Sequence, residues 1–134
     1  MLRESGLTKA EREMIVVATS GANDCLYCIV AHGAILRIYA KNPYVADQVA
    51  VNHREAQISD RQKAMLDFAL KVATRSAEIV EADFAALRAH GFSDEDIWDT
   101  GAIAAFFALS NRMAGLIAMQ PNEEFYLLGR APRA

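Results

Sequence analysis

The sequence contains few of the residues that interrupt helices. Its 134 residues include seven glycines and three prolines. Proline lacks the backbone N–H that a helix uses, and glycine loses more conformational freedom than other residues when it becomes helical. Alanine, which has the highest helix propensity, is abundant, and no two segments alternate apolar and polar residues as paired strands do. The composition therefore predicts an all-α fold.

The sequence also lacks a strong excess of one charge. The net charge is −3, and lysine and arginine are scattered along the chain. Proteins that bind nucleic acid usually concentrate positive charge on one face or along one helix. We therefore expect no nucleic-acid partner.

No hydrophobic segment has the character of a membrane span. The most apolar stretch, residues 102–119, carries Asn111 and Arg112 near its middle. Because a charged side chain is costly inside a bilayer, this stretch is predicted to be a buried helix of a globular protein. The first residues are charged and do not resemble a secretory signal peptide. We expect a cytoplasmic protein without membrane association.

Cysteine is scarce as well. The two cysteines, Cys25 and Cys28, are too few for the disulfide framework of a small secreted domain. Their C-x-x-C spacing is instead typical of a redox or metal-binding motif in a reducing compartment. The segment around them is therefore where we expect chemistry.

Helix-start signatures divide the chain into about six helices within a single domain, residues 1–134. A serine or threonine followed three residues later by an acidic residue or glutamine occurs at Thr8, Ser59 and Ser93. Helices are expected over residues 8–19, 25–40, 44–52, 59–73, 80–89 and 93–119. Apolar residues make up 53% of the chain, which is high for a soluble domain, so we expect one helical face to be buried in a homo-oligomer.

The segment that carries chemistry places two thiols and an imidazole on one face of a helix. Cys28 follows Cys25 by three residues, and His32 follows Cys28 by four. Residues at these spacings lie above one another on a helix. Free N–H groups and the helix dipole favour a thiolate at Cys25, and His32 is within reach of the Cys28 proton, directly or through one water. This arrangement suits nucleophilic thiol chemistry. When one cysteine is oxidised to a sulfenic acid, the other cysteine, one turn away, can trap it as a disulfide.

A carboxylate on the preceding helix completes the predicted site. A turn at residues 20–24, with Asn23 or Asp24 as the cap of the next helix, folds the two helices into a hairpin. Such a hairpin brings Glu13 near His32, where a carboxylate would orient the imidazole and raise its basicity.

Other interpretations of the same residues stay open on the sequence alone. The two cysteines could be buried core residues, which behave as small hydrophobes. Together with His32 and Glu13 they could instead bind a structural zinc ion. A thioredoxin-like protein is excluded, because its C-x-x-C motif needs neighbouring strands.

Polar residues outside this segment are given structural roles. His53 and His90 are expected at the surface or as helix caps. Asn111 and Arg112 need polar partners within their apolar helix, and we expect a carboxylate across an interface.

The residues described so far carry a resemblance to a known family. Glu13, the C-x-x-C pair and His32 resemble the signature of the alkylhydroperoxidase D-like group, the redox-active branch of the carboxymuconolactone decarboxylase superfamily. Four segments are similar to its subgroup of uncharacterised peroxidase-related enzymes, namely residues 10–14, 28–34, 91–94 and 106–112. The resemblance extends over essentially the whole chain.

This resemblance implies an all-α homo-oligomer, a trimer or a hexamer, that reduces organic hydroperoxides in antioxidant defence. It implies that Cys28 attacks the peroxide and that Cys25 then forms a disulfide with it. It further implies that Glu13 and His32 relay protons. No bound cofactor or metal is implied, and the reductant is an external dithiol, such as dihydrolipoamide on a partner protein.

The chain departs from its relatives at two points. The best-studied members carry a histidine between the cysteines, where this chain has Leu26 and Tyr27. Relatives in the subgroup also carry a helical stretch before the segment with which this chain begins.

The main alternative to a peroxidase is a disulfide oxidoreductase or redox-sensing oligomer without peroxide turnover. A decarboxylase of the same fold is less favoured, because that branch does not rely on a C-x-x-C pair.

Overall fold

The computed structural model describes residue 1 and residues 4–131, and all regular secondary structure within them is helical. The α-helices are α1 (Lys9–Ala22), α2 (Leu26–Ala40), α3 (Val45–Asn52), α4 (Asp60–Arg75), α5 (Glu81–Ala89), α6 (Asp94–Leu116) and α7 (Glu123–Leu127). Short 3-10 turns, η1 (His53–Glu55) and η2 (Ser76–Glu78), follow α3 and α4. The predicted all-α fold is confirmed.

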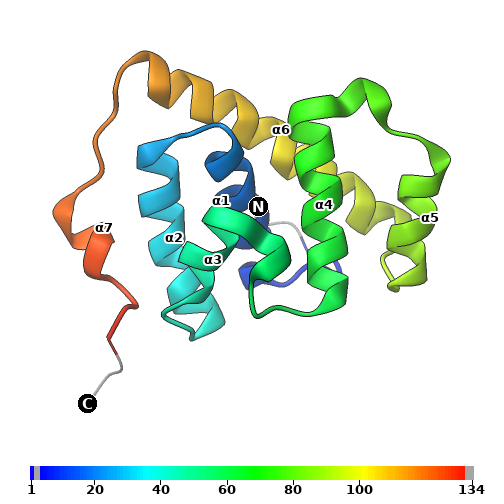
Figure 1. Ribbon diagram of the computed structural model, residues 1–134, viewed down its shortest axis with the longest axis horizontal. Coiled ribbons are helices and arrows are strands. Elements are labelled where there is room, and N and C mark those ends of the chain that lie inside the picture. The colour runs from blue at the N-terminus through cyan, green and yellow to red at the C-terminus, as the bar shows by residue number, and fades with distance from the viewer. Residues whose placement is uncertain (2–3, 132–134) are drawn as a thin grey trace.

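Helix α1 forms the centre of the molecule. It packs against α2, α3, α4 and α6, as Figure 1 shows. Its apolar residues from Met14 to Ala18 are all buried, which agrees with the sequence of this segment, apolar on every side. Burial of a large apolar side chain contributes roughly 1.5–3 kcal/mol, so α1 anchors the helices around it.

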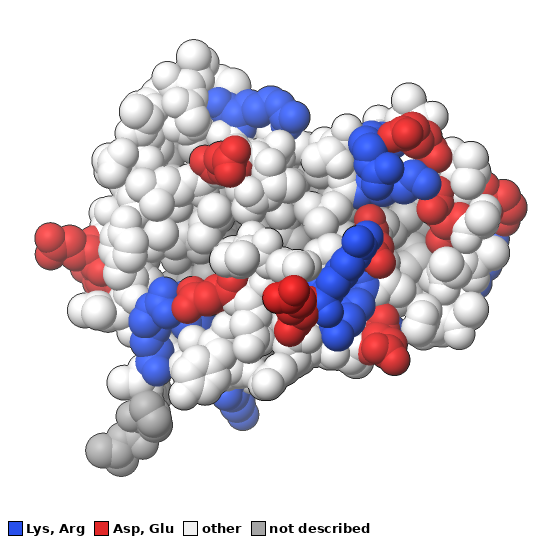
Figure 2. Space-filling model, in the orientation of Figure 1, with Lys and Arg blue, Asp and Glu red and all other residues white. Residues whose placement is uncertain are grey.

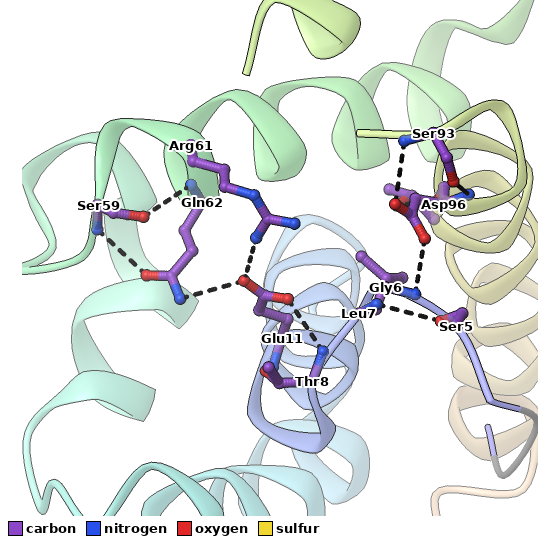
Figure 3. A network of polar contacts seen from close by, with 11 residues as sticks. Ser5, Gly6, Leu7, Thr8, Glu11, Ser59, Arg61, Gln62, Ser93 and Asp96 are labelled. Atoms are coloured by element: carbon purple, nitrogen blue, oxygen red, sulfur yellow. Dashed lines mark hydrogen bonds and ion pairs between the residues drawn. The ribbon is translucent and has the colours of Figure 1, made fainter. Parts of the chain in front are cut away.

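The starts of α1, α4 and α6 are linked by a network of side-chain contacts (Figure 3). The three N-caps are Thr8, Ser59 and Ser93, and each belongs to a complete capping box. Glu11 of the first box accepts hydrogen bonds from Arg61 and Gln62 at the start of α4. Asp96 of the third box accepts the backbone N–H of Gly6 at 2.8 Å. All three helix-start signatures of the sequence are confirmed, and their side chains also join one helix to another.

The turn between α1 and α2 is shorter than the sequence predicts. Helix α1 continues to Ala22, so Ser20 is helical, and the N-cap of α2 is Cys25 rather than Asn23 or Asp24. Asp24 instead adopts a left-handed conformation, with φ of 53°, which lets the chain reverse within a few residues. Burial of the end of α1 favours the longer helix, because Ser20 is fully buried there.

The C-terminal segment contains a helix beyond the six that the sequence predicts. Helix α7 packs beside α2, at the left edge of Figure 1. The guanidinium of buried Arg37 holds it, donating from Nε to the carbonyl of Leu128 at 2.7 Å and from Nη2 to that of Phe125 at 2.9 Å. This short helix therefore depends on a tertiary contact rather than on a local signal.

Helix α6 leaves one apolar side uncovered. Its exposed large side chains include Phe106, Leu109, Met113 and Leu116, which recur at helical spacing. On the face drawn in Figure 2, acidic and basic side chains lie next to one another, mainly over α4 and α5. Among the described residues, no helix combines the length and the hydropathy needed to cross a membrane.

Candidate functional site

Both cysteines lie at the start of α2, where the end of α1 and the C-terminal half of α6 pass close by (Figure 1). They are free thiols, and their exposed fractions are only 4% for Cys25 and 2% for Cys28. They pack against Ala114 of α6. Cys25 is the N-cap residue, and its Sγ accepts the backbone N–H of Cys28 at 3.4 Å. The helix start thus brings the two thiols together and supplies an N–H group to the first.

The acidity of Cys28 reflects its burial. The pKa of its thiol is raised from 9.0 to about 11, mainly by burial and next by its hydrogen bond with Cys25. Hydrogen bonds with Asn111 and Ser20 lower the pKa but do not outweigh burial. At neutral pH Cys28 is therefore protonated, and its nucleophilic form requires a proton acceptor.

A carboxylate–imidazole pair lies on the same two helices. Glu13 Oε2 of α1 is 2.7 Å from His32 Nδ1 of α2, which confirms the expected approach of these two residues. Glu13 is buried and His32 is half-buried, with its ring packed edge-on against Phe107 at 4.9 Å between ring centres. A neutral imidazole that donates from Nδ1 to the carboxylate keeps Nε2 free to accept a proton.

The His32 imidazole and the Cys28 thiol are one helical turn apart. His32 follows Cys28 by four residues on α2, as the sequence predicts. Within the described part of the chain, no hydrogen bond joins the His32 ring to Cys28 Sγ. A proton moving between them must therefore cross a bridging water or follow a change of rotamer.

Two polar residues beside Cys28 do not belong to the predicted site. Asn111 of α6 is 2% exposed, and its Nδ2 donates to Ser20 Oγ at 2.9 Å. Its Oδ1 accepts from Asn23 Nδ2 at 3.1 Å. Within its own chain Asn111 is thus partnered by a hydroxyl and an amide, and Arg112 donates to the carbonyl of Ala108. A carboxylate across an interface stays a prediction. An asparagine within an apolar helix was the signal available in the sequence.

A small cavity opens beside the first cysteine. Its volume is about 130 Å³. Its walls include Cys25, Leu26, Tyr27, Ala114 and Met119. Cys28 does not line it, so Cys25 is the sulfur that a molecule in this cavity would meet first. Leu26 and Tyr27, the two residues between the cysteines, form part of the wall.

Two of the other interpretations can be compared with the structure. In the part of the chain described, no group of three histidine, cysteine or acidic residues is placed to hold a metal ion. His53 is the C-cap of α3, which agrees with the expected cap, but it is buried rather than at the surface, and its Nε2 lies 2.6 Å from Asp67 Oδ1 of α4. His90 is the exposed C-cap of α5, which agrees with the expected cap.

Comparisons with known proteins give a consistent assignment. The family model for the carboxymuconolactone decarboxylase family matches residues 1–43, a segment that contains Glu13, both cysteines and His32. A comparison with curated proteins finds no match. Several solved structures do match the chain.

The alkylhydroperoxidase AhpD core, an uncharacterized peroxidase-related protein from Ralstonia eutropha JMP134, is 70% identical, with a TM-score of 0.98 over 99% of this chain and 70% of that chain. An uncharacterized peroxidase-related protein from Silicibacter sp. TM1040 is 49% identical, with a TM-score of 0.91 over 94% of this chain and 66% of that chain. A protein of unknown function from Agrobacterium tumefaciens, named as a candidate antioxidant defence protein AhpD, is 26% identical, with a TM-score of 0.74 over 87% and 80% of the two chains. With this likeness in sequence and fold, the chain belongs to the carboxymuconolactone decarboxylase family, within its AhpD-like, peroxidase-related group.

Proposed function

We propose that the protein reduces organic hydroperoxides through Cys25 and Cys28 and so serves antioxidant defence. The observation that carries the proposal is the contact between Glu13 and His32 beside two buried thiols at one helix start. A thiol that is protonated at rest needs a base, and a carboxylate-held imidazole one turn away is a suitable one. The names of the relatives, which refer to peroxidases and antioxidant defence, agree with this chemistry.

The first step of the proposed reaction is oxidation of Cys28. Nε2 of His32 takes the thiol proton through a bridging water, and Glu13 stabilises the imidazolium that forms. The Cys28 thiolate attacks one peroxide oxygen, an S–O bond forms and the O–O bond breaks. The departing alkoxide takes the proton from His32 and leaves as an alcohol, while Cys28 becomes a sulfenic acid.

The second step restores the thiols. The Cys25 sulfur attacks the sulfenic acid, a disulfide forms and water leaves. An external dithiol then donates two electrons and two protons in thiol–disulfide exchange. Because Cys25 lines the 130 Å³ cavity and Cys28 does not, we propose that the dithiol attacks Cys25. Dihydrolipoamide on a partner protein is the proposed reductant, and the reaction needs no bound cofactor or metal.

We also propose that the protein forms a homo-oligomer, a trimer or a hexamer. The uncovered side of α6, formed by Phe106, Leu109, Met113 and Leu116, is the surface we assign to the subunit contact. Contiguous apolar surface of this kind is unusual on a monomer and is typical of subunit interfaces.

A second function is favoured by one specific observation. The pKa of Cys28, raised to about 11 by burial, lowers the thiolate fraction that peroxide attack requires. A disulfide oxidoreductase or a redox sensor without peroxide turnover tolerates a slower thiol. The C-x-x-C pair would then exchange disulfides with other proteins through Cys25.

One trapping experiment separates these functions. In the reduced Cys25→Ser variant, an organic hydroperoxide should add one oxygen atom to Cys28, detected by mass spectrometry after reaction with a sulfenic-acid probe. In the matched Cys28→Ser variant, Cys25 should gain no oxygen over the same period. If Cys28 gains none, or if both variants react equally slowly, the peroxidase assignment fails and the disulfide-exchange function takes its place.

A further inference from the structure

A hydrogen-bonded pair of polar side chains, Asn111 and Ser20, lies against Cys28 and has no part in the reaction described above. We infer that these two side chains donate hydrogen bonds to the Cys28 thiolate and hold its sulfur for reaction. The inference rests on the proposed function only in taking Cys28 as the reacting thiol. It adds two residues to the site, from α6 and from the last turn of α1.

The three residues meet at a junction of three helices. Ser20 lies in the last turn of α1, beside the start of α2, where its carbonyl accepts the backbone N–H of Cys25 at 3.0 Å. Asn111 reaches the same point from α6, with its Nδ2 2.9 Å from Ser20 Oγ. Ala114, one turn further along α6, packs against both cysteines. Asn111 and Ser20 are close enough to Cys28 for their polar side chains to lower the pKa of its thiol, against the larger effect of burial.

Asn111 and Ser20 each keep one hydrogen-bond donor that is not used between them. The Asn111 amide has two N–H groups, of which one is donated to Ser20 Oγ. Ser20 Oγ accepts that bond, so its single O–H proton is free for Cys28. The carbonyl oxygen of Asn111 already accepts from Asn23 Nδ2 at 3.1 Å, which fixes which end of the amide faces the thiol. One N–H and one O–H therefore remain for the thiolate.

Because Asn111 and Ser20 are buried, their hydrogen bonds can stabilise a buried negative charge. Ser20 is 0% and Asn111 2% exposed, and buried polar groups are costly unless they are hydrogen-bonded. A thiolate accepts two such bonds better than a neutral thiol does, because bonds to a charged acceptor are stronger. The pair thus stabilises negative charge as His32 removes the Cys28 proton. Asn23, which acts only through Asn111, is a positioning residue.

The test uses variants that remove each donor in a Cys25→Ser background, where one thiol titrates. Asn111→Leu keeps the shape of the side chain without its N–H groups, and Ser20→Ala removes one hydroxyl. The rate of alkylation by iodoacetamide is measured against pH below the titration midpoint. Each variant should raise the midpoint by about one pH unit, which leaves about tenfold fewer thiolates at a given pH below it. The rate itself falls about threefold, because a more basic thiolate is more nucleophilic.

Thr19→Val is the matched control. Thr19 lies beside Ser20 on α1 and is also fully buried, but its hydroxyl has no hydrogen-bond partner among the residues described. This variant should keep the parent pH profile, whereas a general loosening of α1 would move all three. Circular dichroism establishes that each variant is folded, and Ser20→Ala, the smaller change, carries the prediction if Asn111→Leu does not fold.

Two outcomes separate the inference from the proposed function. If the alkylation profiles of Ser20→Ala and Asn111→Leu coincide with that of the parent, the donor role is wrong, whatever the wild-type protein does with peroxide. If both profiles shift but the reduced wild-type protein does not react with an organic hydroperoxide, the donor role stands and the peroxidase function fails.

Discussion

Glu13 Oε2 and His32 Nδ1 lie 2.7 Å apart, although 19 positions separate the two residues in the sequence. The contact joins α1 to α2 and fixes the imidazole between the buried carboxylate and the ring of Phe107. A histidine held in this way presents one ring nitrogen in a defined orientation. In the proposed reaction, this contact supplies the two buried thiols with a base.

The first prediction concerns this base. Glu13→Gln keeps the shape of the side chain but removes the charge that stabilises the imidazolium. We expect hydroperoxide-dependent thiol loss to slow about tenfold or more, since general-base catalysis typically contributes at least that much. Stopped-flow thiol counting measures the rate. The exposed Glu95 provides the control, because Glu95→Gln should leave the rate unchanged. A Glu13→Gln protein as fast as the wild type would contradict the relay.

The second prediction concerns stability and pH. Burial raises the pKa of Cys28 from 9.0 in the unfolded chain to about 11 in the folded protein. The folded state therefore holds this proton more tightly, and the resulting contribution to the free energy of unfolding is complete below about pH 9. It is lost as the pH rises toward about 11. Urea unfolding of reduced protein should show a steeper decline in the wild type than in Cys28→Ser, and parallel declines would contradict the raised pKa.

The third prediction concerns the uncovered side of α6. Leu109 lies in the middle of this apolar side and is 59% exposed. Leu109→Glu places a charge that an interface would have to desolvate, so the oligomer should dissociate. Sedimentation velocity measures the change. Val51→Glu, at an exposed apolar residue of α3, is the control and should leave assembly intact. A wild-type protein that is monomeric at all concentrations would rule out this use of α6.

The fourth prediction concerns the end of α1, which carries Ser20. A Cβ atom added at Gly21 would lie 2.4 Å from the carbonyl oxygen of Ala50, so α1 can approach α3 this closely only with glycine. Gly21→Ala should destabilise the protein by about 1–3 kcal/mol. Gly115→Ala, where a Cβ meets nothing within 4 Å, should instead be neutral or stabilising by up to about 1 kcal/mol. Thermal or urea unfolding measures the stability of both variants. Equal stabilities of Gly21→Ala and Gly115→Ala would show that α1 and α3 can move apart at Gly21 without loss of stability.

Much of the site is predictable because its determinants are local. Helical spacing alone places Cys28 and His32 on one face of α2, and a short turn is enough to bring Glu13 beside His32. The helix starts are equally local, since each capping box lies within four consecutive residues. These signals do not depend on how distant helices pack.

The remainder of the site depends on tertiary packing. The contact between Asn111 and Ser20 joins residues 91 positions apart, and only the placement of α6 on α1 creates it. Burial of His53 depends likewise on how η1 packs on α4. The acidity of Cys28 also follows from packing, because the nearby His32 favours its thiolate whereas burial opposes it.

The most direct test of peroxide reduction is rapid mixing of the fully reduced protein with an organic hydroperoxide, with free thiols counted over time. The account predicts fast loss of two thiols per chain in the wild type and no such loss in Cys28→Ser. Thiol loss in the wild type no faster than that of an ordinary free thiol would contradict it.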